Sequence, residues 1–309
     1  MSQIKAAAYY AGIPAKNSNP EKPLILDYFC YGVTACGDIA VPHKGFNTID
    51  CDVALIQGFV HDDGKTLPHL QLRRDAINLQ KQKGKRSLIV DSNLFLYVNK
   101  KNPLHYLRYS FDGVFPTTAN YFWDDPDPSR WQQISRDQNI SLKDWRTKGN
   151  YILICTQRPG GWSMKGLEVN QWLNQTIAEI RKYSDRPIVV RSLPGAKGSR
   201  ESVVTNNKSS LYTVSFNKLI TQDFINAHAV ITYNSSPGVA AAIEGIPVFV
   251  TDPNPRISQA YEVSNHSLSL LENPQMPDRQ GWIERISMSH WNNEDVLTGQ
   301  AWRHIKKFI

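Results

Sequence analysis

The stretch ITYNSSPGVAAAIEGIPVFV, residues 231–250, places a small polar turn between two apolar runs. The first run is rich in β-branched and apolar residues, which is typical of a buried strand. Pro237 suits the first position of a helix because it has no amide hydrogen to leave unbonded, and Gly245 marks a helix end. The stretch therefore predicts a strand, a helix and a second strand, the unit from which parallel α/β sheets are built.

Apolar runs alternate with helical patterns over most of the remaining chain. This alternation favours an α/β protein with parallel strands. A helix that crosses between the second and third strands is predicted to end at Gly84. The predicted strands are residues 23–29, 53–59, 87–92, 113–117, 151–157, 187–192, 211–216, 229–234 and 246–252.

The chain has 309 residues. A single hydrophobic core rarely supports a chain of this length, so we expect two domains. The regular pattern lapses over residues 123–149, which we interpret as a domain connection. We predict two Rossmann-like domains, residues 1–145 and 146–280, that face each other across a cleft. Residues 281–309 are expected to form a helical tail that packs back on the first domain.

Hydrophobic residues make up 41% of the chain and charged residues 20%, as in ordinary globular proteins. No apolar run reaches the roughly 18 residues that a membrane span needs, and the N-terminus lacks a signal-peptide core. We therefore expect a cytoplasmic protein with no membrane partner. Four cysteines without paired spacing, and DxD patterns at residues 50–52 and 124–128 that do not follow a strand, favour no bound metal or tightly bound cofactor.

The turn of the opening stretch has two interpretations. A serine at the helix N-cap would accept hydrogen bonds from backbone amides, and this explains a Ser-Pro pair by local structure alone. A turn of small residues also presents amides and hydroxyls at a helix N-terminus, where the helix dipole favours an anion. Two neighbouring loops support the anion-binding interpretation, because loops after parallel strands meet at one edge of the sheet and would bring their residues to the same site. Those loops contribute Arg158, Gly160, Gly161, Lys165, Arg191 and Lys197.

The order VVRS-LPG, followed by DFINAHAVITYNSSPGVAAAIEGIPVFVTDP, resembles the second half of GT-B glycosyltransferases. The resemblance is nearest to the capsule-polysaccharide type and related bacteriophage transferases, and it covers residues 151–252. It implies a nucleotide-diphosphate sugar as co-substrate, with the diphosphate on Asn234, Ser235 and Ser236. It also implies that Glu244 contacts the nucleoside. We expect Glu244 in the first turns of the helix, where it can reach the ribose hydroxyls.

One departure from the family pattern concerns the leaving group. Leu193 stands where relatives often have a histidine that contacts phosphate or assists the leaving group. This leaves Arg191 as the main cation of that loop. A changed donor, a reduced rate or compensation by Arg158 would each fit this departure.

Transfer of a sugar to a hydroxyl needs a base for the hydroxyl proton and stabilisation of the departing diphosphate. We expect the base on a loop of the first domain, at the carboxyl end of a strand. Asp38, in a glycine-rich loop, and Asp91, at the end of residues 87–92, are the candidates. A turn or a helix cap explains Asp38 equally well. His43 and His61 are alternatives.

The acceptor has three interpretations. The chain also looks like proteins of tailed bacteriophages, a group in which sugar transfer onto hydroxymethylated DNA pyrimidines is common. Together with a net charge of +7, this makes a DNA base in the host cytoplasm the first hypothesis. The basic residues from Arg73 to Arg86 would meet phosphates, and Tyr106 or Tyr109 would stack on an extruded base. A polysaccharide or lipid-linked glycan is the second hypothesis, and a non-catalytic DNA-binding phage protein is the third.

Overall fold

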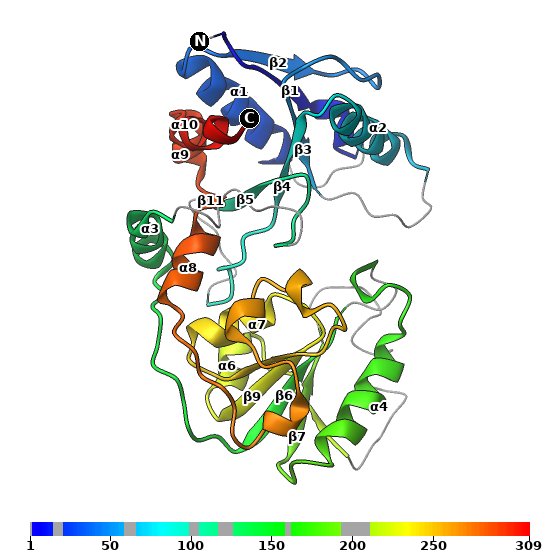
Figure 1. Cartoon of the computed structure of the whole chain (residues 1–309), viewed down its shortest axis with the longest axis vertical. Helices are drawn as coiled ribbons and strands as arrows, with labels where there is room; N and C mark the ends of the chain where they lie inside the picture. The colour runs from blue at the N-terminus through cyan, green and yellow to red at the C-terminus, as the bar shows by residue number, and fades with distance from the viewer. Residues whose placement is uncertain are drawn as a thin grey trace. The chain divides into compact units, whose positions relative to one another are not determined.

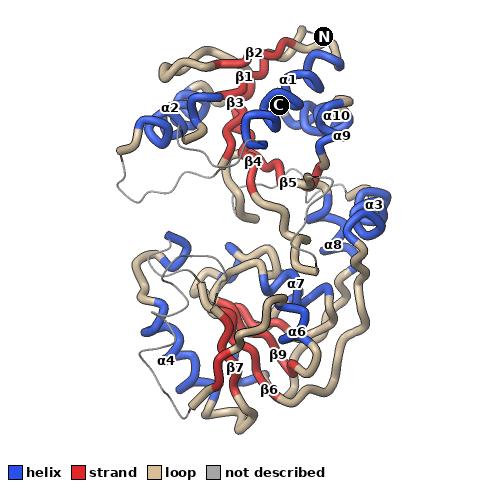
Figure 2. Tube along the Cα trace, turned by 180° about the vertical axis from the view of Figure 1, so that it is seen from behind, coloured by secondary structure: helices blue, strands red, loops and turns tan. Residues whose placement is uncertain are grey.

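The computed structural model contains two compact units, shown as a ribbon in Figure 1 and as a tube in Figure 2. Unit 1 comprises Met1–Asn93, Asn102–Asp127 and Arg285–Ile309, and unit 2 comprises Leu94–Lys101 and Pro128–Glu284. The residues that the structure describes are 2–14, 21–58, 66–98, 105–116, 126–157, 162–192 and 211–309.

Unit 1 is built on a six-stranded sheet with the strand order β11-β5-β4-β3-β1-β2. The strands β1 to β4 run parallel, and β5 and β11 are antiparallel to their neighbours. The strands are β1 Lys5–Tyr9, β2 Ile39–His43, β3 Val53–Gln57, β4 Arg86–Asp91, β5 Leu107–Phe111 and β11 His290–Trp291.

Helices cover both faces of this sheet, because successive side chains of a strand point to opposite faces. Ala6 and Ala8 belong to a core cluster with α1, α9 and α10, whereas Ala7 and Tyr9 belong to a second cluster with α2. Figures 1 and 2 show the same arrangement from both sides. These helices are α1 Glu21–Ala35, α2 Pro68–Gln82, α9 Asn293–Leu297 and α10 Gln300–Ile305.

The C-terminal helices pack against α1, which confirms the prediction that the end of the chain returns to the first domain. The Trp302 ring meets the Phe29 ring edge-on, with 5.5 Å between the ring centroids. Gly32 allows α1 to approach α9 closely, because a Cβ at this position would lie 2.0 Å from the Val296 carbonyl oxygen. The close approach makes α9 and α10 part of the core of unit 1.

Unit 2 contains an all-parallel sheet of five strands in the order β10-β9-β6-β7-β8. Its central strands β6 and β9 are almost entirely buried, with α4 on one face and α6 and α7 on the other (Figures 1 and 2). The strands are β6 Tyr151–Cys155, β7 Ile188–Arg191, β8 Thr213–Val214, β9 Ala227–Thr232 and β10 Val248–Val250. The helices are α3 Pro128–Gln138, α4 Val169–Ile180, α6 Ile220–Phe224, α7 Pro237–Ile243 and α8 Gln280–Ser287, the last ending in unit 1.

Six short 3-10 helices complete the secondary structure of the described residues. They are η1 Tyr10–Gly12, η2 Trp162–Met164, η3 Pro255–Ile257, η4 Tyr261–Val263, η5 Leu268–Leu270 and η6 Lys306–Phe308. In the described part of the chain, no helix combines the length and the apolar character that crossing a membrane requires.

The α/β fold class with two mainly parallel sheets is confirmed, and the predicted strands of the second half are confirmed apart from their exact ends. Two strand predictions in the first half are wrong. Residues 23–29 belong to α1, where Leu26, Phe29 and Val33 share one helical face in the core. The described residues of 113–117 form a turn, and the strand β5 ends just before it.

Replacing Gly32 by alanine is expected to lower the free energy of unfolding by about 1–3 kcal/mol, the usual cost of overpacking a core. The physical reason is the 2.0 Å approach of the new Cβ to the Val296 carbonyl oxygen, which forces α1 and α9 apart. Urea denaturation followed by circular dichroism measures the change. Thr34→Ala, at an exposed position of the same helix, is the matched control and should change stability little. Equal stability of the two variants would contradict the close packing.

Candidate functional site

The carboxyl ends of the strands of unit 2 meet at one edge of its sheet, where α/β proteins usually bind ligands. Cys155 at the end of β6 lies in register with Arg191 of β7 and Thr232 of β9. The loops that follow these strands therefore start from neighbouring positions. They contribute, with the loop after β10, Gln157, Asn234, Ser235, Ser236 and Asp252.

Asn234 is buried at the centre of this edge and joins three loops. Its side-chain amide donates to Asp252 Oδ2 over 2.7 Å and to the Ser163 carbonyl over 3.2 Å. Its carbonyl oxygen accepts from Gln157 Nε2 over 2.5 Å. These bonds use the Asn234 side chain internally, so it positions the turn and does not itself present a free group to a phosphate.

The serines that follow Asn234 are arranged differently. Ser236 is exposed and precedes Pro237, but its side chain makes no capping hydrogen bond to α7. The Ser235 hydroxyl oxygen is buried and has no hydrogen-bond partner among the described residues. The same holds for Oε1 of Gln157, a residue that is 9% exposed. Helix capping therefore does not explain the serines, and a ligand at this edge could provide the hydrogen-bond partners that these buried polar atoms lack among the described residues.

Arg191 was expected to be the main cation facing phosphate, and the structure gives it another partner. Its side chain is buried and forms an ion pair with Asp223, in the helix α6. It also donates to the Asn217 carbonyl over 3.0 Å. Asp223 further accepts hydrogen bonds from Ser215 and Asn217. The guanidinium thus holds the segment before α6, and we do not retain Arg191 as a phosphate ligand.

The loop after β6 is described only in part. Arg158, Gly160 and Gly161 lie outside the described residues, as does Leu193 in the loop after β7. Lys165 is described: it is exposed and has a positive φ of 51° just after η2. It remains a candidate for a ligand contact from this loop.

Glu244 does not lie where it was expected. It follows the C-terminal end of α7, whereas Ser236 precedes the other end, so a helix of seven residues, about 10 Å, separates them. The carboxylate is buried, accepts a hydrogen bond from the Tyr97 hydroxyl over 3.1 Å and pairs with Lys143. The prediction that Glu244 sits in the first turns of this helix is therefore wrong, and the proposed ribose contact loses its basis.

Asp38 has a structural environment at the start of β2. Its carboxylate accepts from the Ile4 amide over 3.0 Å, from Trp302 Nε1 over 2.7 Å and from Lys306 Nζ over 2.9 Å. Burial alone would raise the pKa of Asp38, but these hydrogen bonds outweigh it and hold the pKa below its ordinary value. Oδ1 thus binds the residue before β1 while Oδ2 binds the C-terminal segment, so the carboxylate links the two and we do not carry Asp38 forward as the base.

Asp91 ends β4 and lies at the carboxyl edge of the parallel strands of unit 1. Its Oδ2 accepts from the buried guanidinium of Arg108 over 2.8 Å, and 31% of its side chain is exposed. His43 Nε2 lies 2.6 Å from the Asn47 carbonyl oxygen, and His61 lies outside the described residues. Asp91 is therefore the candidate base that combines a fixed orientation with access.

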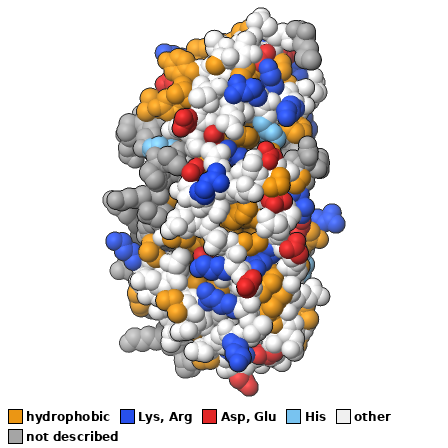
Figure 3. Space-filling view, turned by 90° about the vertical axis from the view of Figure 1, so that its left-hand side faces the viewer, with side chains coloured by type: hydrophobic (Ala, Val, Ile, Leu, Met, Phe, Trp, Pro, Cys, Tyr) orange, Lys and Arg blue, Asp and Glu red, His pale blue; other side chains and the backbone are white. Residues whose placement is uncertain are grey.

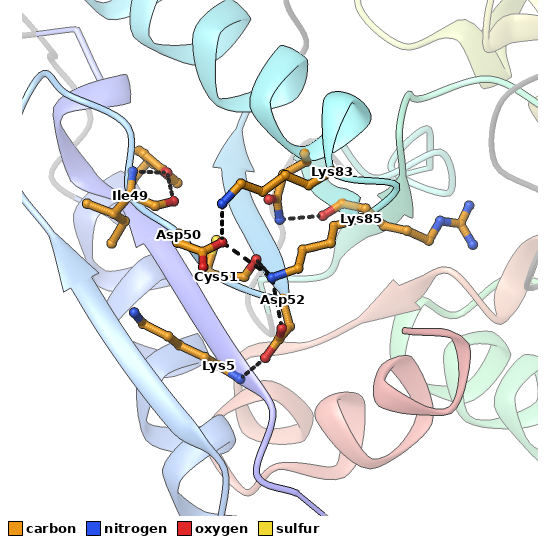
Figure 4. Close-up of polar contacts among 10 residues, drawn as sticks. Lys5, Ile49, Asp50, Cys51, Asp52, Lys83 and Lys85 are labelled. Carbon is orange, nitrogen blue, oxygen red and sulfur yellow. Dashed lines mark hydrogen bonds and ion pairs between the residues drawn. The ribbon is translucent and has the colours of Figure 1, made fainter.

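The DxD pattern at residues 50–52 is an ion-pair cluster, shown in Figure 4. Asp50 Oδ1 lies 2.8 Å from Lys83 Nζ, and Asp52 Oδ1 lies 3.1 Å from Lys85 Nζ. Hydrogen bonds from the two lysines lower the pKa of Asp50. β3 begins at Val53, directly after the pattern, which confirms its interpretation as a strand entry.

The residues expected to contact DNA are mostly engaged within the protein. Arg73 is buried, and its Nε donates to the Gly12 carbonyl over 2.7 Å. Tyr106 and Tyr109 are 0% and 1% exposed, so the hypothesis that they stack on an extruded base is wrong. On the face in Figure 3, lysine and arginine side chains are interspersed with acidic and apolar ones.

Comparison with known proteins identifies the fold. No family model and no curated protein matches the sequence. Among solved structures, the chain is similar to the beta Kdo 2,7 transferase of KpsC from Thermosulfurimonas dismutans, at 12% identity and a TM-score of 0.51 over 97% of this chain and 99% of that one. It is also similar to the beta Kdo 2,4 transferase of KpsC from the same organism, at 11% identity and a TM-score of 0.54 over 93% and 91%. These likenesses show a glycosyltransferase fold of the GT-B type for nearly the whole chain.

Sequence reasoning missed two residues of the site, Gln157 and Asp252. Each is the second residue beyond the end of its strand, β6 or β10, and each bonds to Asn234. Both are the last residues of predicted strands, 151–157 and 246–252, and this was the available signal, because the carboxyl ends of parallel strands reach the ligand edge of the sheet.

Replacing Asn234 by alanine leaves the buried Asp252 carboxylate and the Gln157 amide without a shared partner. We expect the free energy of unfolding to fall by roughly 1–3 kcal/mol, the cost of unsatisfied buried polar groups. Urea denaturation provides the measurement. Asn170→Ala, at an exposed position of α4, is the control and should change stability by a few tenths of a kcal/mol at most. If both variants unfold at the same urea concentration, the network does not hold the turn.

The Asp38 contacts predict a pH dependence of stability. The folded-state pKa of Asp38 lies below its unfolded value of about 3.9, so its stabilising contribution is present above that value. The contribution is lost as the pH falls through the folded-state pKa. The difference in urea midpoint between the wild type and Asp38→Asn should therefore be constant from pH 5 to pH 7 and shrink below about pH 4. A difference that grows on acidification would show that the sign is wrong.

Proposed function

We propose that this protein is a glycosyltransferase that takes a sugar from a nucleotide-diphosphate donor held by the loops after β6 and β9. The observation that carries the proposal is the pair of buried atoms Ser235 Oγ and Gln157 Oε1 at adjacent strand ends, neither of which has a hydrogen-bond partner among the described residues. Sites built from polar groups at the carboxyl edge of a parallel sheet bind nucleotides in many α/β proteins. The GT-B fold of the chain supports a nucleotide sugar as the ligand.

The proposed donor site stabilises the diphosphate through hydrogen-bond donors. The amides of Ser235 and Ser236 donate to no described residue, and the two hydroxyls add two further donors. Lys165, exposed in the loop after β6, supplies a positive charge. Donors fixed in advance at the point where charge develops stabilise a leaving group without reorganising in the transition state.

The proposed base is Asp91, in unit 1. Its carboxylate would accept the proton of the acceptor hydroxyl as the hydroxyl oxygen attacks the anomeric carbon and the nucleotide diphosphate leaves with the bonding electrons. The 2.8 Å bond from Arg108 fixes the orientation of one oxygen, and the partial exposure leaves the group reachable.

A glycan is the acceptor we propose. The two similar structures are transferases of the sugar Kdo, whereas the described residues expected to stack on a DNA base are buried. The net charge of +7 favours polyanions in general, which includes acidic glycans as well as DNA.

The double variant Ser235→Ala/Ser236→Ala is expected to bind nucleotide diphosphates and their sugars at least about 100-fold more weakly, because two hydrogen bonds to a charged group, each contributing about 1.5–3 kcal/mol, are lost. Isothermal titration with uridine, guanosine and cytidine diphosphates and their common sugars gives the affinities. Ser267→Ala/Ser269→Ala, a pair of exposed serines in the same unit, is the matched control. Unchanged affinity in the first double variant, or no binding by the wild type, would overturn the donor site.

The acceptor class is tested with the donor that binds. Release of nucleotide diphosphate should rise on addition of oligosaccharides and stay at the hydrolytic background with hydroxymethylated DNA. Stimulation by DNA, together with salt-sensitive DNA retention, would instead restore the DNA-base hypothesis. Asp91→Asn should abolish the stimulated release while leaving donor affinity unchanged.

A further inference from the structure

A pocket lies in unit 2, separate from the turn that carries the serines. Its volume is about 310 Å³, at the lower end of the range for small-molecule sites. Its walls are formed by the segment after α3, the helix α6 with the residue that follows it, the residue after α7, and Val98. The lining residues used below are Asn139, Ser141, Lys143, Arg146, Thr221 and Ile225.

The wall of this pocket is fixed by the backbone. The Lys143 amide donates to the Ile243 carbonyl over 2.9 Å, and the Arg146 amide donates to the Gly245 carbonyl over 2.6 Å. Gly245 has a φ of 73°, and a Cβ there would lie 2.0 Å from the Asp144 carbonyl oxygen. Only glycine allows so close an approach, so the pocket is formed before any ligand arrives.

The charges of the lining leave an excess of one positive charge. Glu244 is 7% exposed, and its carboxylate pairs with Lys143 and accepts a hydrogen bond from the Tyr97 hydroxyl. Arg146 has no carboxylate partner in this lining: its Nη1 donates to backbone carbonyls, including that of Ile225 over 3.0 Å. A ligand with a single negative charge balances this set.

The uncharged lining residues favour a hydroxyl-rich ligand. Asn139, Ser141 and Thr221 offer amide and hydroxyl groups that both donate and accept hydrogen bonds. Ile225, 66% exposed, adds an apolar surface. A sugar ring matches this combination, because its edges carry hydroxyls and its faces carry C–H groups.

We propose that this pocket binds a sugar that carries a carboxylate, as a subsite for one unit of an acidic glycan. That the unit belongs to the acceptor rests on the proposed function; the binding of the sugar acid does not. The subsite lies apart from the serine turn, so a glycan chain and a nucleotide donor do not compete for the same residues.

The experiment compares D-glucuronate with D-glucose as probes, by saturation-transfer NMR on the full chain. Wild type should bind glucuronate more tightly than glucose, and Ser141→Trp, which fills the pocket from an exposed position, should lose glucuronate binding. Thr147→Trp places the same ring on the same segment outside the lining, and it should bind as the wild type does. Thr221→Val, which keeps the size of the side chain and removes its hydroxyl, should weaken binding severalfold.

Three outcomes overturn the proposal: no glucuronate binding by the wild type, equal binding by Ser141→Trp, or equal binding of glucose and glucuronate. Nucleotide affinity, measured in the same samples, separates this result from the fate of the donor site. Nucleotide binding without glucuronate binding refutes the subsite alone. Glucuronate binding without nucleotide binding retains the subsite and refutes the proposed function.

Discussion

The buried amide of Asn234 is the constraint on which the candidate donor site depends. Parallel strands share no hairpin, so nothing local sets the distance between the loops at their carboxyl ends. Asn234 sets it, because its bonds to Gln157 and Asp252 require the loops after β6, β9 and β10 to meet. Burying a polar group without a hydrogen bond is costly, and the bonds to Asn234 therefore hold Gln157 and Asp252 at this edge. The position of Ser235, the next residue in the chain, follows from that requirement.

The second sheet could be predicted from the sequence because its strands are buried along their whole length. All six residues of β9 are buried, and a strand buried on both faces reads as a continuous apolar run. The first sheet was harder for two reasons. β1 contains three alanines in succession, a residue type with little preference for strands. The run at residues 23–29 is apolar and short, and its helical state depends on packing against α9 and α10, which lie far along the chain.

In the candidate site, too, features that are contiguous in sequence could be predicted, and contacts between distant positions could not. The small turn at Ser235 could be predicted, because its composition and the flanking strand and helix are contiguous in sequence. Arg191 was placed at the correct strand end, but Asp223, 32 positions later, decides where its side chain points. Gln157 contacts Asn234 across 77 positions, and no short motif encodes such a pair. The position of Glu244 was predicted wrongly because α7 has only seven residues, so Glu244 follows its C-terminal end and does not lie in its first turns.

The formal net charge is a weak guide to the partner of this protein, because several of its arginines and lysines form hydrogen bonds or ion pairs within the protein. Arg73, Arg108, Arg191 and Arg279 are buried, and each donates hydrogen bonds to carbonyls or carboxylates of its own unit. Lys83 and Lys85 are paired with Asp50 and Asp52. These cations release few counterions on binding a polyanion, since their charges are already balanced or shielded from solvent. The sugar-acid subsite that we propose relies instead on one cation, Arg146, which has no carboxylate partner in the pocket lining.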